Sequence, residues 1–174
     1  MIMKKIITVL CTIALLLSCQ SVVAQPKPVI STKYSNEKIQ EMISSFKNGY
    51  SQDATAPASL VSKFNLDFPN AKDIDWEAVA DIYEVEFEIG RVDYKAFYKG
   101  TDLLMYTRDI QVSELPAVVK NTAISKYPDY DFEDIEEINI GTDLIYKVEL
   151  EHHKKEVTMK IKYDGTILKE KFDR

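Results

Sequence analysis

The sequence contains few of the residues on which enzyme chemistry depends: two cysteines, two histidines and five glycines among 174 residues. Both cysteines, Cys11 and Cys19, lie near the N-terminus, so a chain cleaved after Ala24 would have no thiol, disulfide or cysteine-ligated metal. The sequence has no glycine-rich phosphate loop and none of the usual serine-nucleophile patterns. We therefore expect no enzyme activity, no catalytic residue and no cofactor.

Basic residues are also outnumbered. Without Lys4 and Lys5 of residues 1–24, the rest of the chain has 20 basic and 28 acidic residues, a net charge of −8. Binding to a nucleic acid backbone needs a basic surface, so this charge argues against nucleic acid as a partner. It favours a partner with a basic patch.

Residues 1–24 have the pattern of a signal peptide. A basic start precedes Ile6–Leu17, 12 uncharged and mostly apolar residues, whereas a membrane span needs ~20. A small-residue cleavage pattern ends at Ala24. Alternatively, Leu16–Cys19 resembles a bacterial lipobox, in which Cys19 would carry a lipid anchor and the protein would be an outer-membrane lipoprotein. We favour a periplasmic or secreted protein without a membrane span, because Leu17 is not the small residue typical of a lipobox.

The remaining chain contains one segment twice. Prolines twelve residues apart occur in both copies, at an offset of 59 between them. Two further blocks match in the same order, at offsets of 63 and 65. The matching segments are Pro57 to Pro69 with Pro116 to Pro128, Tyr83–Glu88 with Tyr146–Glu151, and Tyr98–Thr101 with Tyr163–Thr166. We predict tandem units at residues 57–112 and 113–174, after a region at 25–56.

Each unit is predicted to be a helix followed by a four-stranded antiparallel meander. A proline begins the helix and a Phe-Pro or Tyr-Pro step ends it. Apolar and polar residues alternate along the strands, which indicates a sheet with one buried and one wet face. The expected strands are 73–77, 83–89, 92–98 and 103–108 in the first unit and 131–137, 145–151, 156–163 and 167–172 in the second. The fold class is α+β, with the two helices on one face.

The region before the first unit has three parts. Residues 25–35 are predicted to be a flexible leader, 36–47 an amphipathic helix and 50–56 a polar linker. The apolar residues of the helix are Ile39, Met42, Ile43 and Phe46. Such a stripe packs on the core of its own domain or docks onto a partner or a second copy, and we favour the first interpretation.

The order of residues resembles a known family. In the first unit the pattern is Phe68-Pro69-x-Ala71-x-x-Ile74-x-Trp76, then Tyr83-x-Val85-x-Phe87, then Tyr98-x-Gly100. The second unit matches through Leu115-Pro116, Tyr127-Pro128, Tyr146-x-Val148-x-Leu150 and Tyr163-Asp164-Gly165, with Ile135 in place of Trp76. This order resembles the PepSY-like, beta-lactamase-inhibitor-protein-like secreted domains of Bacteroidetes. The resemblance covers residues 57–174 and implies two helix-plus-four-strand repeats, with no catalytic residues to carry over.

Two clusters were considered as metal sites. His152 and His153 are neighbours in a strand turn, where adjacent side chains point to opposite faces. Asp129, Asp131 and Glu133 imitate the start of a calcium loop, but Asp134 stands where that loop needs glycine. We expect neither cluster to bind a metal.

The wet face of the sheet is the candidate partner-binding surface. In the first unit it places Glu84, Glu86 and Glu88 opposite Asp93, Lys95, Phe97 and Lys99. The candidate contacts among them are Glu84, Glu86, Lys95, Phe97 and Lys99. Phe97 is a large apolar residue on the polar side of its strand, which is typical of a contact residue. Tyr106 is a further candidate contact. Its face is left open, because Leu103 and Leu104 are both apolar and alternation does not fix the register of strand 103–108.

Glutamates gather on strand 83–89 of the wet face, and lysines gather on strand 156–163 and at Lys169 and Lys171. Charge pairing across strands also keeps an exposed sheet soluble without any binding role. The sequence nevertheless favours an exported, non-catalytic binding module, inhibitor-like or sequestering, that contacts another exported protein. The alternative is a structural or envelope-assembly protein that docks through its N-terminal helix.

Overall fold

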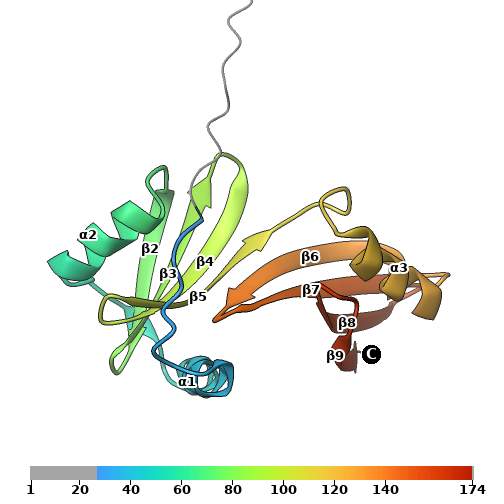
Figure 1. Ribbon diagram of the computed structural model, residues 1–174, viewed down its shortest axis with the longest axis horizontal. Helices are drawn as coiled ribbons and strands as arrows, with labels where there is room; N and C mark the ends of the chain where they lie inside the picture. The colour runs from blue at the N-terminus through green and yellow to red at the C-terminus, as the bar shows by residue number, and fades with distance from the viewer. Residues whose placement is uncertain (1–26, 174) are drawn as a thin grey trace, which may run out of the picture.

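The computed structural model describes residues 27–173 (Figure 1). They form an α+β fold with three helices and one open antiparallel sheet of nine strands. The predicted signal peptide, with Cys11, Cys19 and the cleavage site at Ala24, lies outside the described residues. Within residues 27–173 no helix is long and apolar enough to cross a membrane.

The strands follow one another across the sheet in chain order, each antiparallel to the next. Helix α2 precedes β2–β5 and helix α3 precedes β6–β9 (Figure 1). Strand β5 pairs with β6, so both halves share one sheet. The elements are α1 (Asn36–Asn48), β1 (Gln52–Asp53), α2 (Ala58–Asp67), β2 (Lys72–Val79), β3 (Ile82–Ile89), β4 (Val92–Lys99), β5 (Asp102–Asp109), α3 (Ala117–Lys126), β6 (Asp131–Ile140), β7 (Asp143–His152), β8 (Lys155–Lys162) and β9 (Ile167–Asp173).

Helices α2 and α3 begin and end alike. Pro57 and Pro116 are their N-caps, with φ of −57° and −55°. Phe68 and Tyr127 are their C-caps, with φ of −131° and −130°. A residue that precedes proline is pushed out of the helical region, so the Phe-Pro and Tyr-Pro steps end the helices.

One face of the sheet has two apolar clusters, one beneath α2 and one beneath α3. The strands supply every second residue to these clusters, as the alternation predicted. The α2 cluster is built on Leu60, Phe64, Phe68, Val85, Phe87, Ala96, Tyr98, Leu103 and Tyr106. The α3 cluster is built on Leu115, Val119, Ala123, Ile135, Tyr146, Val148, Leu150, Val157, Met159 and Ile161, with Ile110.

Helix α1 covers part of the opposite face. Its buried residues Ile39, Ile43 and Phe46 pack on a third apolar cluster that spans both halves. The strand residues of this cluster are Ile82, Phe97, Leu104, Met105, Ile138, Ile140 and Ile145. The helix therefore packs on its own sheet, which is the interpretation that the sequence favoured. Its buried stripe is not available for docking onto a partner.

The leader is held rather than flexible over its described part, which corrects the prediction for residues 25–35. The Ser31 backbone N–H donates a hydrogen bond to the Leu103 carbonyl at 2.8 Å. Lys33 donates to Asp102 at 3.0 Å, and Ile30 packs on the α2 cluster. These contacts fasten the leader to β5.

A β-bulge resolves the register of β5. Phe97 pairs with Met105 and Tyr98 pairs with Leu103, so Leu104 is an extra residue. Leu104 and Met105 consequently both join the cluster beneath α1, while Leu103 and Tyr106 join the cluster beneath α2. This is why two adjacent residues are both apolar.

Strand pairing also corrects one equivalence between the halves. Tyr83 pairs with Tyr98, but its counterpart Tyr146 pairs with Ile161 and not with Tyr163. Tyr98 is fully buried, whereas Tyr163 lies beyond the end of β8 and is 60% exposed. The offset of 65 therefore reflects a longer turn after β8, because the strands themselves keep an offset of 63.

Candidate functional site

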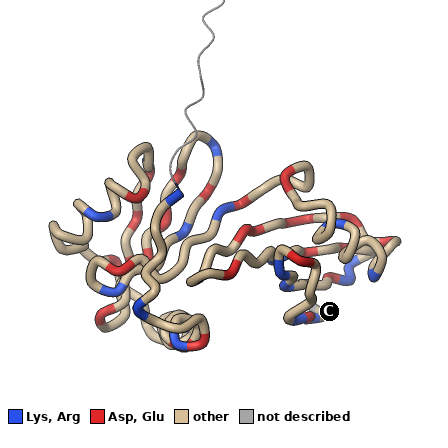
Figure 2. Tube along the Cα trace, in the orientation of Figure 1, with Lys and Arg blue, Asp and Glu red and all other residues tan. Residues whose placement is uncertain are grey.

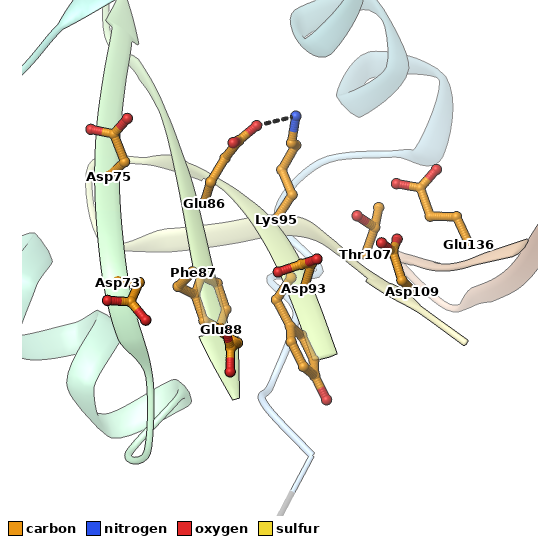
Figure 3. A pocket seen from close by; sticks show the side chains of 11 residues that line it. Asp73, Asp75, Glu86, Phe87, Glu88, Asp93, Lys95, Thr107, Asp109 and Glu136 are labelled. Atoms are coloured by element: carbon orange, nitrogen blue, oxygen red, sulfur yellow. Dashed lines mark ion pairs between the residues drawn. The ribbon is translucent and has the colours of Figure 1, made fainter. Parts of the chain in front are cut away.

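The part of the α1 face that α1 leaves open contains a depression of about 480 Å³ (Figure 3). It spans five strands, β2 to β6. Seven of its eleven lining residues are acidic, and Lys95 is its one basic residue. The lining residues are Asp73, Asp75, Glu86, Phe87, Glu88, Asp93, Tyr94, Lys95, Thr107, Asp109 and Glu136.

The acidic side chains converge because alternate residues of a strand point to the same face. Strand pairing then aligns them in rows across the sheet. One row runs through Asp75, Glu86, Lys95 and Thr107, each the register partner of the next. In the next row Glu88 pairs with Asp93, and Asp109 pairs with Glu136. Like charges that face each other across strands are unfavourable.

Lys95 offsets part of this negative charge. Its Nζ lies 2.5 Å from a carboxylate oxygen of Glu86 and 3.2 Å from one of Glu84. Burial opposes the charge of Lys95, but hydrogen bonds to Glu86 and Glu84 outweigh it and raise the pKa of Lys95. For Glu84 burial dominates and raises the pKa, although Lys95 acts to lower it.

At the far end of the depression the negative charge accumulates. Burial raises the pKa of Asp109, and the carboxylates of Asp134, Glu136 and Asp93 raise it further. Lys147 opposes this shift only weakly. The depression therefore has a net negative field from rigid strands, which would attract a cationic group.

Two of the six predicted contact residues line this depression. Glu86 on β3 and Lys95 on β4 are cross-strand neighbours, and both line the depression (Figure 3). Glu84 is buried beside them and bonds to Lys95. Lys99 lies at the opposite end of β4, where it forms an ion pair with Asp81.

The predicted exposure of Phe97 and Tyr106 is wrong. Phe97 does point to the α1 face, but α1 covers it and its exposed fraction is 0%. Tyr106 points to the other face and is buried beneath the end of α2, 5.7 Å from the ring of Phe68. Neither side chain can touch a partner of the folded protein.

Sequence reasoning missed four acidic residues of the depression: Asp73, Asp75, Asp109 and Glu136. Polar alternation in β2 could have indicated Asp73 and Asp75. Asp109 and Glu136 lie 27 positions apart in the chain and meet only because β5 pairs with β6. The sequence predicted that the two units form a sheet, but not which strands of the two halves pair.

The other half of the open face has a row of three lysines. Lys147, Lys160 and Lys169 face one another across β7, β8 and β9. Figure 2 shows lysines gathered on the strands near the C-terminus. On β7–β9 this face has both charges, because Glu149, Glu151 and Glu156 lie on it beside the lysines. The acidic half of the face is therefore the part on β2–β6.

Of the residues considered as metal ligands, Asp129 lies in the turn before β6, and Asp131 and Glu133 lie in β6. His152 is the last residue of β7, and His153 follows it in the β7–β8 turn. Within residues 27–173 no group of three or more histidine, cysteine, aspartate or glutamate side chains is arranged to hold a metal. The rings of His152 and His153 lie 4.1 Å apart. His153 has a φ of 47°, which places it in a tight turn.

No family model and no curated protein matches the chain. Several solved structures do. A DUF2874 family protein from Bacteroides uniformis has a TM-score of 0.62 at 18% identity, over 68% of this chain and 90% of that one. A BLIP-like protein from Bacteroides fragilis has a TM-score of 0.60 at 19% identity, over 73% and 91%. A candidate periplasmic protein from Bacteroides eggerthii has a TM-score of 0.62 at 17% identity, over 68% and 90%.

These similarities show that the chain has the BLIP-like fold of these Bacteroides proteins, as the resemblance predicted. At such low identity they show the fold alone. A fold does not by itself assign a function.

Proposed function

We propose that this chain is an exported, non-catalytic binding module that holds a basic patch of another exported protein against the acidic half of its open sheet face. The observation that carries the proposal is the depression on β2–β6, in which seven acidic side chains surround Lys95. A partner that brings lysines or arginines into it would neutralise carboxylates that now face one another.

The rigidity of the surface supports this proposal. The acidic residues belong to strands that are fastened on one side by the α2 cluster and on the other by α1. The backbone of such a frame loses little conformational entropy when a partner binds. Complementary charge at such a surface gives specificity and a fast association rate more than raw affinity.

The chemistry of the depression favours binding over catalysis. General acid catalysis by a carboxyl group needs an apolar pocket that raises its pKa towards neutrality. The depression is open and its walls are mostly charged. The described residues also bring no histidine into it.

An exported location agrees with two further observations. The first 24 residues have a signal-peptide pattern, and one structural neighbour is a candidate periplasmic protein. We infer a periplasmic or secreted protein, with an outer-membrane lipoprotein anchored at Cys19 as the alternative. The mass of the mature N-terminus distinguishes these locations.

We also infer that the two halves are copies of one unit. Their helices share cap geometry at Pro57 and Pro116. Each half has a β-bulge between its third and fourth strands, at Leu104 in the first and Leu168 in the second. Strands β3–β4 and β7–β8 match at a constant offset of 63.

The proposal is tested by crosslinking in the native cell, followed by affinity measurement with the purified partner. A photo-crosslinking residue at Asp93 should capture a partner that the same residue at Asp129 does not. The double variant Glu88→Lys/Asp93→Lys should then weaken binding by more than about tenfold, or 1.4 kcal/mol.

The matched control is Asp53→Lys/Asp129→Lys, which changes the net charge equally at two exposed positions outside the depression. It should bind nearly as well as the wild type. Equal loss in both double variants would show that only net charge matters and would refute the acidic half as the contact surface.

A further inference from the structure

The two edges of the sheet are protected differently. At one edge β1 pairs with β2 at Gln52–Ala78 and Asp53–Glu77. The remainder of β2 has an irregular register near Asp73, whose φ is 50°. Bulges and short covering strands are how proteins prevent unwanted pairing at an edge.

The other edge lacks such a cover among the described residues. The strand order ends at β9, and no described segment pairs with the outer side of its seven residues. An uncovered edge presents a row of backbone N–H and C=O groups that can pair with another strand.

Large apolar side chains are exposed on this same strand. Phe172 is 64% exposed and Leu168 is 47% exposed. The ring of Phe172 lies 6.2 Å from the ring of Tyr127 on the helix side of the sheet. Exposed apolar groups on an edge strand would gain stability from a covering segment.

The lysine row of the open face ends at this edge. Lys147, Lys160 and Lys169 are successive register partners, and like charges in such positions repel. At the inner end of the row Lys147 pairs with Glu136 and forms an ion pair with Glu149. Among the side chains that the structure describes, none forms a salt bridge with Lys160 or Lys169. Burial lowers the pKa of Lys160, and Lys47, Lys169 and Lys147 lower it further, although Glu136 acts to raise it.

We propose that the outer edge of β9 accepts an extended segment of another exported protein as a tenth strand, and that this segment has acidic residues at alternate positions. An acidic side chain opposite Lys169 would place a carboxylate at the outer end of the row, as Glu136 does at the inner end. The intervening apolar side chains would lie on the other face, where they cover Phe172. Backbone hydrogen bonds would supply affinity, and the alternate side chains would supply specificity.

A second copy of this chain fits the edge poorly. Lys169 and Lys171 point to the same face, because their partners Lys160 and Thr158 do. If two β9 strands paired antiparallel along most of their length, Lys169 of one copy would therefore lie opposite Lys171 of the other. The lysines disfavour self-pairing and favour an acidic strand.

The site is separate from the depression of the proposed function, so the two can be tested independently. The probe is a heptapeptide of alternating valine and glutamate, compared with peptides of alternating valine and lysine. Binding is measured by calorimetry at low salt, and the exchange of the β9 backbone amides is followed by NMR. We expect the glutamate peptide to bind at least about tenfold more tightly and to slow exchange on the outer side of β9.

Three variants make the test specific. Lys169→Glu should reverse the preference between the two peptides, whereas Lys155→Glu, an exposed change on β8, should not. A proline at the centre of the glutamate peptide should abolish binding, because proline has no N–H to donate to the edge. Glu88→Lys/Asp93→Lys, which tests the proposed function, should leave peptide binding intact.

Equal binding of both peptides, or full binding of the proline peptide, would overturn the strand-addition site. Slower exchange of the β9 amides when the wild-type protein is concentrated without peptide would show that a second copy occupies the edge, and would also overturn it.

Discussion

The ring of Phe97 stands at right angles to the ring of Phe46, with their centroids 5.6 Å apart and an interplanar angle of 84°. Phe97 belongs to β4 and Phe46 to α1, so this contact joins the N-terminal helix to the α1 face of the sheet. This contact explains why Phe97 is apolar although the other residues on that face of β4 are charged. Phe97 belongs to the core beneath a helix that lies outside the two proposed repeat units.

Removal of this contact should destabilise the fold. Phe97→Ala leaves a cavity beneath α1, and we expect a loss of about 3–5 kcal/mol in the free energy of unfolding. Urea denaturation measures it. Tyr50→Ala, at a position 88% exposed, should change stability by less than about 0.5 kcal/mol. Unchanged stability of Phe97→Ala would mean that α1 does not cover the sheet in solution.

The buried hydroxyl of Tyr98 donates a hydrogen bond to Asp67 at 2.9 Å, and Lys63 forms an ion pair with the same carboxylate. Tyr98→Phe should cost about 1–3 kcal/mol, because it removes a donor from a buried carboxylate. Tyr163→Phe, on the exposed tyrosine of the second half, is the control and should be neutral. Equal effects in urea denaturation would contradict the burial of Tyr98.

Acid should weaken the junction between the halves. Arg108 on β5 donates to Glu137 on β6 at 3.3 and 3.2 Å. Burial opposes ionisation of Glu137, but hydrogen bonds from Arg108 and Asn139 outweigh it and lower the pKa. The unfolded state therefore binds the proton more tightly.

The stability that Glu137 contributes is present above its unfolded pKa of about 4.3 and is lost as the pH falls through its lower folded pKa. Glu137→Gln should be less stable than the wild type at neutral pH, and the difference should shrink on acidification. The measurement is the melting temperature of both proteins by thermal unfolding, from neutral pH down to pH ~3. A difference that stays constant with pH would show that the charge of Glu137 does not matter.

Asp109 should behave in the opposite way. Its folded pKa is raised by burial and by neighbouring carboxylates, so its ionisation costs stability. That cost is absent below its unfolded pKa of about 3.9 and complete above its folded pKa. Asp109→Asn should therefore raise the melting temperature at neutral pH and leave it unchanged at low pH. A lower melting temperature at neutral pH would contradict the crowding of carboxylates at this end of the depression.

Binding of the partner should weaken modestly with salt. The Debye length contracts from about 30 Å at 0.01 M to about 8 Å at 0.15 M, so exposed charges attract over a shorter range. A salt titration of association and dissociation rates should show the effect mainly in association. Affinity that is indifferent to salt, or strong retention on a DNA column, would contradict the acidic half as the contact surface.

Local sequence was sufficient for the elements of this fold. Alternation of apolar and polar residues placed the main strands, since a strand exposes its two faces in turn. Pro57, Pro69, Pro116 and Pro128 bounded the two helices through steric rules that act between neighbours. The same alternation assigned Glu86 and Lys95 to one open face, where the structure has them.

Only the tertiary structure decided which parts of that face are open. Burial depends on what packs above a residue, and Phe97 lies beneath a helix that begins about sixty residues earlier in the chain. The pairing of β5 with β6 likewise brought Asp109 to Glu136, because contacts between distant segments leave no periodic signal in either segment alone. The sequence by itself therefore determined the strands, helices and charge of this protein, and long-range packing determined which of its residues a partner can reach.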